Sequence, residues 1–122
     1  MDKQKNEKIK KNLKEFQEMG FGSEQMYEIF IGLESGIDVA EYADPKFNYD
    51  QMREIRHGLE EGLDVSKYAD PKFDWEQMRE IWIGLEHNVD VSKYTNPDFN
   101  WGTMYEIRKE MEKEKKEPEL EI

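Results

Sequence analysis

Apolar positions return along this chain at intervals of 26 residues. Methionine, for example, stands at Met26, Met52, Met78 and Met104. Phenylalanine, isoleucine and proline repeat at the same interval. Self-similarity at such a period is typical of repeat proteins, in which each unit buries its apolar face on its neighbours. The pattern therefore predicts an array of similar units.

Each unit is predicted to begin with a long helix that follows a phenylalanine. A capping box is predicted from the spacing of Asn48 with Gln51 and of Asp74 with Gln77. In a capping box the side chain of the cap residue accepts a hydrogen bond from the backbone N–H of the third helical residue, and the side chain of that third residue accepts one from the backbone N–H of the cap. The preceding phenylalanine and the following methionine are predicted to pack as a hydrophobic staple. Helix ends are expected at three residues that tolerate a left-handed conformation. These are Gly36, Gly62 and Asn88.

A second, short helix is predicted after each long one. Its caps are Asp38, Asp64 and Asp90, followed by a valine and a tyrosine that are expected to point inward. Glycines also stand inside the long helices, where each costs roughly 0.5–1 kcal/mol relative to alanine. These are Gly32, Gly58 and Gly84. Their repetition predicts that a neighbouring backbone packs closely there.

The ends of the chain depart from the repeat. Ile9, Leu13 and Phe16 recur at helical spacing, which predicts an amphipathic helix that stops at Gly20 and caps the first unit.

We expect one all-α domain, a small α-solenoid-like array. Its segments are a capping helix at 1–20, repeats at 21–46, 47–72 and 73–98, a truncated repeat with the C-terminal helix at 99–117, and a disordered tail at 118–122.

Charge indicates what the chain binds. The net charge is −11, and residues 16–107 carry seven basic residues against twenty acidic ones, whereas residues 1–15 hold six lysines against three acids. The acidic part of the chain, residues 16–107, repels nucleic acid and membrane surfaces and favours a protein partner with a basic surface. The chain has no cysteine and no apolar run that could span a bilayer, so we expect a cytoplasmic protein.

No residue pattern predicts catalysis. His57 and His87 occupy different repeat positions, and neither has a second histidine or a cysteine at metal-ligand spacing. No glycine-rich loop that could cradle a phosphate is found. We therefore expect a non-enzyme with no cofactor and no metal.

Acidic residues recur on the helix face opposite the apolar stripe and would align in stacked copies. They are Glu24, Glu28, Asp50, Glu54, Glu76, Glu80 and Glu106. One interpretation is a solvated face, since acids in a first turn also complement the helix dipole. The other is a row of carboxylates that imitates a nucleic-acid backbone, with Glu28, Glu54 and Glu80 as its main charges.

Apolar and aromatic residues alternate between odd and even copies. Phe30 and Ile31, and then Trp82 and Ile83, stand where the even copies have Arg56 with His57 and Arg108 with Lys109. On a helical wheel the two isoleucines point outward, and Phe30 and Trp82 lie at the flank of the core stripe. This composition is typical of interface hot spots. Simple edge packing explains Phe30 and Trp82 equally well.

The motif QMREIRHGLEEGLDVSKYADPKF resembles a short tandem repeat of uncharacterised proteins from Gram-positive gut bacteria, phages and mobile elements. The resemblance covers Phe21 to about Arg108 and is lost at the end of the fourth copy. The family implies no activity, but its setting suggests inhibitors of host defence nucleases, of the anti-CRISPR or antirestriction type. The sequence thus predicts a protein-binding inhibitor that covers a basic nucleic-acid groove. The alternative is a structural or adaptor repeat that self-associates into a homo-oligomer.

Overall fold

The computed structural model describes residues 2–116, and this part of the chain is all-α, as predicted. It forms two compact units, Met1–Gly62 and Leu63–Ile122. The boundary falls between a long helix and the short helix that follows it, inside a sequence repeat. The expectations of one domain and of one continuous array stay predictions. The tail expected at 118–122 lies outside the described residues.

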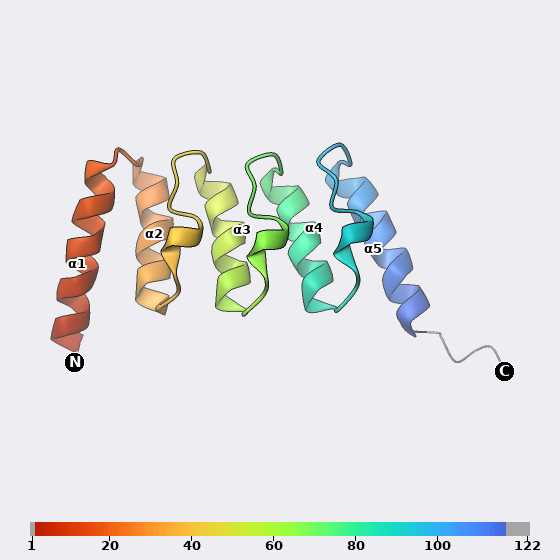
Figure 1. Cartoon of the computed structure of the whole chain (residues 1–122), viewed down its shortest axis with the longest axis horizontal. Coiled ribbons are helices and arrows are strands. Elements are labelled where there is room, and N and C mark those ends of the chain that lie inside the picture. Colours follow the sequence, from red (N-terminus) through yellow and green to blue (C-terminus); the bar gives the residue numbers. More distant parts are fainter. Residues whose placement is uncertain (1, 117–122) are drawn as a thin grey trace. The chain divides into compact units, whose positions relative to one another are not determined.

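The first unit contains three long helices and one short one (Figure 1). They are α1 (Asp2–Glu18), α2 (Ser23–Ser35), the 3-10 helix η1 (Val39–Glu41) and α3 (Tyr49–Glu60). α2 packs against both α1 and α3. The segment that contains η1 returns the chain along α2, so α2 and α3 run in the same direction.

The second unit repeats part of this arrangement. It consists of the 3-10 helix η2 (Val65–Lys67), α4 (Trp75–Glu86), the 3-10 helix η3 (Val91–Lys93) and α5 (Trp101–Lys116). α4 packs against α5, and η3 lies against α4, as η1 lies against α2. Among residues 2–116, none of the helices combines the length and apolar character needed to cross a bilayer.

The predicted helix boundaries are confirmed. Asn48 and Asp74 each accept a hydrogen bond from a backbone N–H at 2.8 Å and form complete capping boxes. The backbone is left-handed at the three predicted ends, with φ of 78° at Gly36, 74° at Gly62 and 60° at Asn88. The short helices are 3-10 turns capped by the predicted aspartates. Local signals therefore set where each helix begins and ends.

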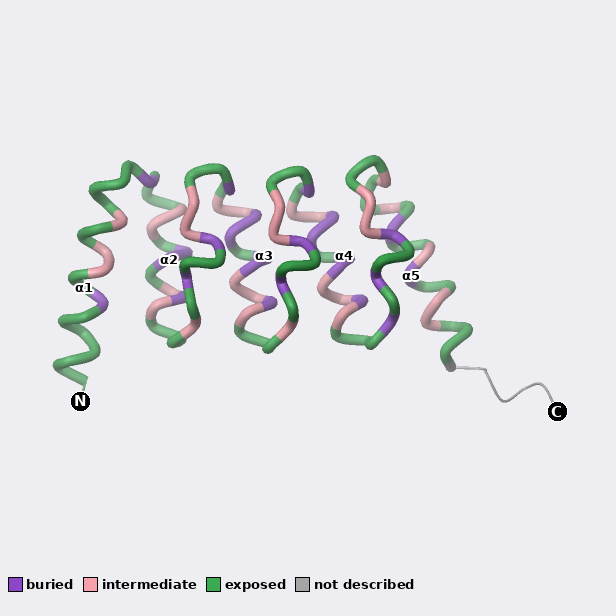
Figure 2. The backbone as a smooth tube through the Cα atoms, viewed as in Figure 1, coloured by how far each residue is buried: buried purple, intermediate pink, exposed green. Residues whose placement is uncertain are grey.

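The core recurs from unit to unit, as the purple segments of Figure 2 show. Its largest side chains lie on the long helices, shortly before them and just after the 3-10 helices. The fully buried ones include Tyr42, Phe47, Met52 and Ile55 in the first unit and Met78, Ile81, Tyr94 and Met104 in the second. Ile9 of α1 is also buried, which agrees with a capping helix.

A tyrosine side chain, and not a neighbouring backbone, packs against the repeated glycines. The Tyr42 hydroxyl donates a 2.6 Å hydrogen bond to the carbonyl oxygen of Glu28 and fills the space that a side chain at Gly32 would need. Tyr94 does the same at Gly84, with a 2.8 Å hydrogen bond to the carbonyl oxygen of Glu80. The expected backbone contact is wrong at these two positions. The glycines make room for a buried phenol that bonds to the preceding helical turn.

These tyrosines predict a loss of stability at alkaline pH. Burial raises the pKa of Tyr42 and Tyr94, so the folded protein keeps protons that the unfolded chain releases above about pH 10. Stability is complete below that pH and falls above it, by about 1.4 kcal/mol per pH unit for each tyrosine. Urea unfolding at a series of pH values measures the fall. Tyr94→Phe should reduce the pH dependence, because it removes one of these two buried phenols. A pH dependence that is the same in this variant and in the unchanged protein would contradict this account.

Candidate functional site

The three main glutamates of the predicted acidic row do not face solvent. Glu28, Glu54 and Glu80 are only 4%, 2% and 7% exposed, so the expectation that they form a charged outer face is wrong. The helical wheel placed them opposite the core stripe of one isolated helix. A helix that packs on a parallel neighbour, as α2 does on α3, buries a second face as well. A partner cannot contact these carboxylates as a surface row.

In the first unit an arginine of α3 pairs with Glu28. Arg56 Nε lies 3.0 Å from Glu28 Oε1, and its Nη1 lies 3.0 Å from Glu60 Oε2. The Ser35 hydroxyl donates a further bond to Glu60 Oε2, at 3.0 Å. Arg53 adds a second cation, with its Nε 3.7 Å from Glu28 Oε2. The network joins α2 to α3.

The second unit has the same network with two changes. Arg108 Nε lies 2.9 Å from Glu80 Oε1 and Nη1 lies 2.7 Å from Glu112 Oε2, while His87 replaces the serine and places Nδ1 2.5 Å from Glu112 Oε2. Tyr105 stands where Arg53 stands in the first unit. Burial alone would raise the pKa of Glu112, but hydrogen bonds from His87 and Arg108 outweigh it and lower that pKa. The Glu112 carboxylate therefore stays charged at neutral pH.

The arginines that pair with Glu28 and Glu80 were not predicted, although the sequence carried a signal for them. Arg56 lies 28 residues after Glu28, and Arg108 lies 28 residues after Glu80. Arginine occurs at this position only in the even copies, and that alternation was interpreted as an interface difference. It marks instead a structural ion-pair network in each unit.

The rest of the acidic set is more accessible. Glu24 and Glu106 are exposed, and Asp50 and Glu76 are half-buried. Asp50 Oδ1 lies 3.5 Å from Arg53 Nη2. A role for these four residues in partner binding stays a prediction.

The predicted apolar set has one well-exposed member. Phe30 is 37% exposed, whereas Ile31, Trp82 and Ile83 are half-buried. The two isoleucines therefore do not stand out from the surface as the wheel suggested, since part of each side chain is covered. Phe30 offers more accessible area than its predicted flank position implied.

A groove of about 280 Å³ lies on the first unit, between the start of α2 and the start of α3. Tyr27, Glu24 and Glu28 line it from α2, and Tyr49 and Arg53 line it from α3. Tyr27 is 61% exposed, the largest exposed fraction among the chain's exposed large hydrophobic side chains in residues 2–116. The Tyr27 ring is therefore accessible to a partner and lies in the same groove as the exposed carboxylate of Glu24.

Cations already stack on aromatic rings of the long helices in both units. The Arg53 guanidinium lies 5.8 Å from the Tyr49 ring centre. In the second unit, Arg79 lies 5.0 Å from the Trp75 ring centre and Arg108 lies 5.4 Å from that of Tyr105. These distances are within cation–π range. Each of these three rings thus already carries an arginine of its own helix.

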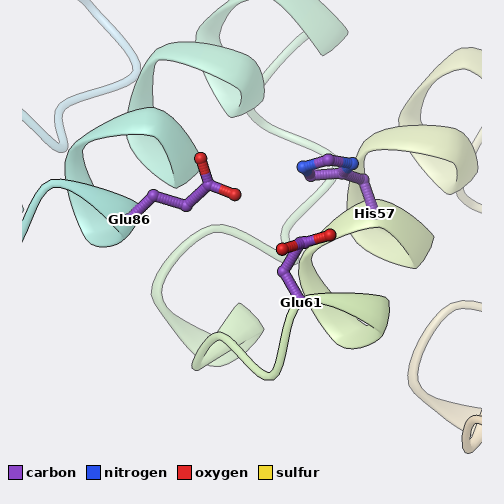
Figure 3. Close-up of side chains that lie close together, drawn as sticks. All are labelled: His57, Glu61 and Glu86. Atoms are coloured by element: carbon purple, nitrogen blue, oxygen red, sulfur yellow. The ribbon is translucent and has the colours of Figure 1, made fainter.

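Figure 3 shows the side chains of one histidine and two glutamates. His57 and Glu61 lie one turn apart at the end of α3, and Glu86 is the last residue of α4. His57 is half-buried, whereas both glutamates are exposed. His57 and Glu61 offer two ligand atoms within their unit, fewer than the four of a structural zinc site. The expected lack of a metal, a cofactor and catalysis stays a prediction.

No protein-family model matches the chain, and the comparisons with curated proteins and with solved structures also find no match.

Proposed function

We propose that this protein acts without catalysis, by binding a basic segment of another protein in the groove between α2 and α3. The observation that carries the proposal is the pair of tyrosines, Tyr27 and Tyr49, beside the exposed carboxylate of Glu24. A lysine or arginine side chain can place its cation over an aromatic face and next to a carboxylate. The groove thus has both groups that recognise a basic side chain.

The net charge of the chain favours a basic protein as the partner over nucleic acid or a membrane. Residues 16–107 hold twenty acids against seven basic residues, which repels nucleic acid and anionic membranes and speeds the approach of cationic surfaces. A nucleic-acid-binding nuclease is one protein with such a surface. Inhibition of a nuclease of this kind, by covering its basic groove, is the sharper form of the proposal. It would use the exposed Glu24 and the groove beside Tyr27, and not the buried glutamates.

A labelled peptide of about 12 residues rich in lysine and arginine tests the proposal by fluorescence anisotropy. We expect it to bind the full chain, and we expect Tyr27→Ala to weaken binding about tenfold, which corresponds to about 1.4 kcal/mol. A peptide with each basic residue replaced by glutamate should not bind.

The matched control is Met19→Ala, which removes another large side chain of the same unit. Met19 is 56% exposed and does not line the groove, so its loss should leave the affinity unchanged. Equal losses in the two variants, or equal binding of basic and acidic peptides, would refute the proposal. An oligomer that Phe30→Glu makes monomeric would favour the self-associating adaptor instead.

A further inference from the structure

Arg53 lies in the groove between α2 and α3, where the proposed function places a basic side chain of the partner. Its guanidinium carbon lies 5.8 Å from the centre of the Tyr49 ring. Its Nε lies 3.7 Å from Glu28 Oε2, and its Nη2 lies 3.5 Å from Asp50 Oδ1. The groove thus already holds one cation of the protein itself, beside an aromatic ring and two carboxylates.

Arg53 is held only loosely in this place. Both of its ion-pair distances exceed the length of about 2.7–2.9 Å that is typical of a charge-assisted hydrogen bond, and its side chain is 44% exposed. Arg56, one turn further along α3, is different. Two of its nitrogens lie 3.0 Å from carboxylate oxygens of Glu28 and Glu60, and its side chain is 16% exposed. Of these two arginines, Arg53 is therefore the one that can leave its place.

The departure of Arg53 would leave no buried charge without a partner. Glu28 is buried, but Arg56 Nε still donates a 3.0 Å hydrogen bond to its Oε1. Asp50 is half-buried and so keeps access to water. The Tyr49 ring would lose the cation that lies over it and could accept another. Exchange of Arg53 for a cation of the partner thus preserves the ion pair that joins α2 to α3.

The contacts of Arg53 also indicate which basic side chain the groove accepts. A guanidinium is planar, stacks on an aromatic face and directs several N–H groups to different acceptors, whereas a lysine ammonium is a compact and strongly hydrated point charge. Arg53 lies over the Tyr49 ring and is directed to two carboxylates. An arginine of the partner can make contacts of the same kind, with the exposed carboxylate of Glu24 in the same groove.

We propose that Arg53 is an internal competitor for the groove, and that the partner's residue that displaces it is an arginine. This inference rests on the proposed function, because it names the side chain that binds there and the residue that limits its binding. A site that is open for only part of the time has its apparent affinity reduced by the open fraction. If Arg53 occupies the groove for about four-fifths of the time, the partner binds about fivefold more weakly than it binds an open groove.

Arg79 of the second unit provides a matched control. It also lies over an aromatic ring of its own helix, 5.0 Å from the centre of the Trp75 ring, and it is exposed. It does not line the groove between α2 and α3. Arg79→Gln therefore changes the net charge as much as Arg53→Gln does, without removing the competitor.

Fluorescence anisotropy with two labelled peptides of about 12 residues, one with only arginine and one with only lysine as basic residues, tests the inference. Arg53→Gln should bind the arginine peptide about fivefold more tightly than the unchanged protein does. Arg79→Gln should leave that affinity unchanged. Arg53→Lys keeps the charge but loses the planar group, so its affinity should lie between those of the unchanged protein and Arg53→Gln. The unchanged protein should prefer the arginine peptide about threefold.

Nuclear magnetic resonance observes the displacement directly. The chain has four arginines, so the side-chain Nε–H groups of nitrogen-15-labelled protein give four signals. The variant Arg53→Lys identifies the signal of Arg53 by its loss. Saturation with unlabelled arginine peptide should shift the Arg53 signal and leave the Arg79 signal in place. Circular dichroism checks that all variants keep their helices.

The possible results separate this inference from the proposed function. The inference alone is overturned if the peptide binds but Arg53→Gln gains no affinity, if Arg79→Gln gains as much, or if Arg53→Lys binds as the unchanged protein does. An Arg53 signal that does not move at saturation, or a preference for the lysine peptide, would also overturn it. If neither peptide binds any of these proteins, the proposed function is refuted and the inference falls with it.

Discussion

Replacing Arg108 with methionine is expected to lower the free energy of unfolding by about 3–5 kcal/mol. The Arg108 side chain is 6% exposed and pairs with Glu80 and Glu112, whose side chains are 10% and 15% exposed. Methionine fills much of the volume but leaves the Glu80 carboxylate inside the protein without its cation. Urea unfolding followed by circular dichroism measures the loss.

Two arginines of the first unit provide graded controls. Arg53→Met should cost less than about 1 kcal/mol, because that side chain is 44% exposed and its ion pairs are screened by water. Arg56→Met should fall between the two, since Arg53 stays 3.7 Å from Glu28 as a second cation. The same small loss in all three variants would show that the networks are not important for stability.

A double variant separates the loss of the pair from the burial of an unpaired charge. Glu80→Met combined with Arg108→Met replaces both charged groups by apolar ones of similar size. Because apolar replacements of a buried ion pair are often close to neutral, we expect the double variant to recover much of the stability that Arg108→Met loses. A double variant that is less stable than Arg108→Met alone would contradict this reason.

Gly84→Ala is expected to destabilise the protein by about 2 kcal/mol, although alanine is the better helix former. The new methyl group would overlap the Tyr94 hydroxyl and would lie 2.8 Å from Val91 Cγ1. Tyr94 cannot move away without losing its hydrogen bond to the Glu80 carbonyl oxygen. The cost of this overlap exceeds the gain in helix propensity of about 1 kcal/mol. Urea unfolding again measures the difference.

A double-mutant cycle assigns the clash to the hydroxyl. In a Tyr94→Phe background the nearest oxygen is gone, so Gly84→Ala should cost less there than in the unchanged protein. Gly102→Ala, in the first turn of α5, is the control, because the nearest neighbouring atom to an added Cβ is Asn100 Oδ1 at 3.3 Å. Its effect should stay within about 0.5 kcal/mol. Additive losses in the cycle would rule out the proposed contact.

The helices and their ends could be predicted because their causes lie within a few residues of each other. A capping box such as Asn48 with Gln51 spans four positions, and a left-handed end such as Gly36 depends on one residue. The apolar period likewise identified the buried Met52 and Ile55. The candidate site was less predictable. The sequence pointed to a basic partner through net charge, but it did not bring Tyr27 and Tyr49 to one groove.

The sequence by itself determined the all-α class, the helix boundaries and the inward tyrosines, because short-range hydrogen bonds and apolar periodicity set them. Only the tertiary structure decided which side of each helix meets water. A helical wheel describes a single isolated helix. In the folded protein, a parallel neighbouring helix buries Glu28 and Glu80, and this neighbour brings an arginine from 28 residues further along the chain. The same packing put a tyrosine hydroxyl where a side chain at Gly32 would lie. Contacts across such distances depend on how helices pack, and no local pattern encodes that geometry.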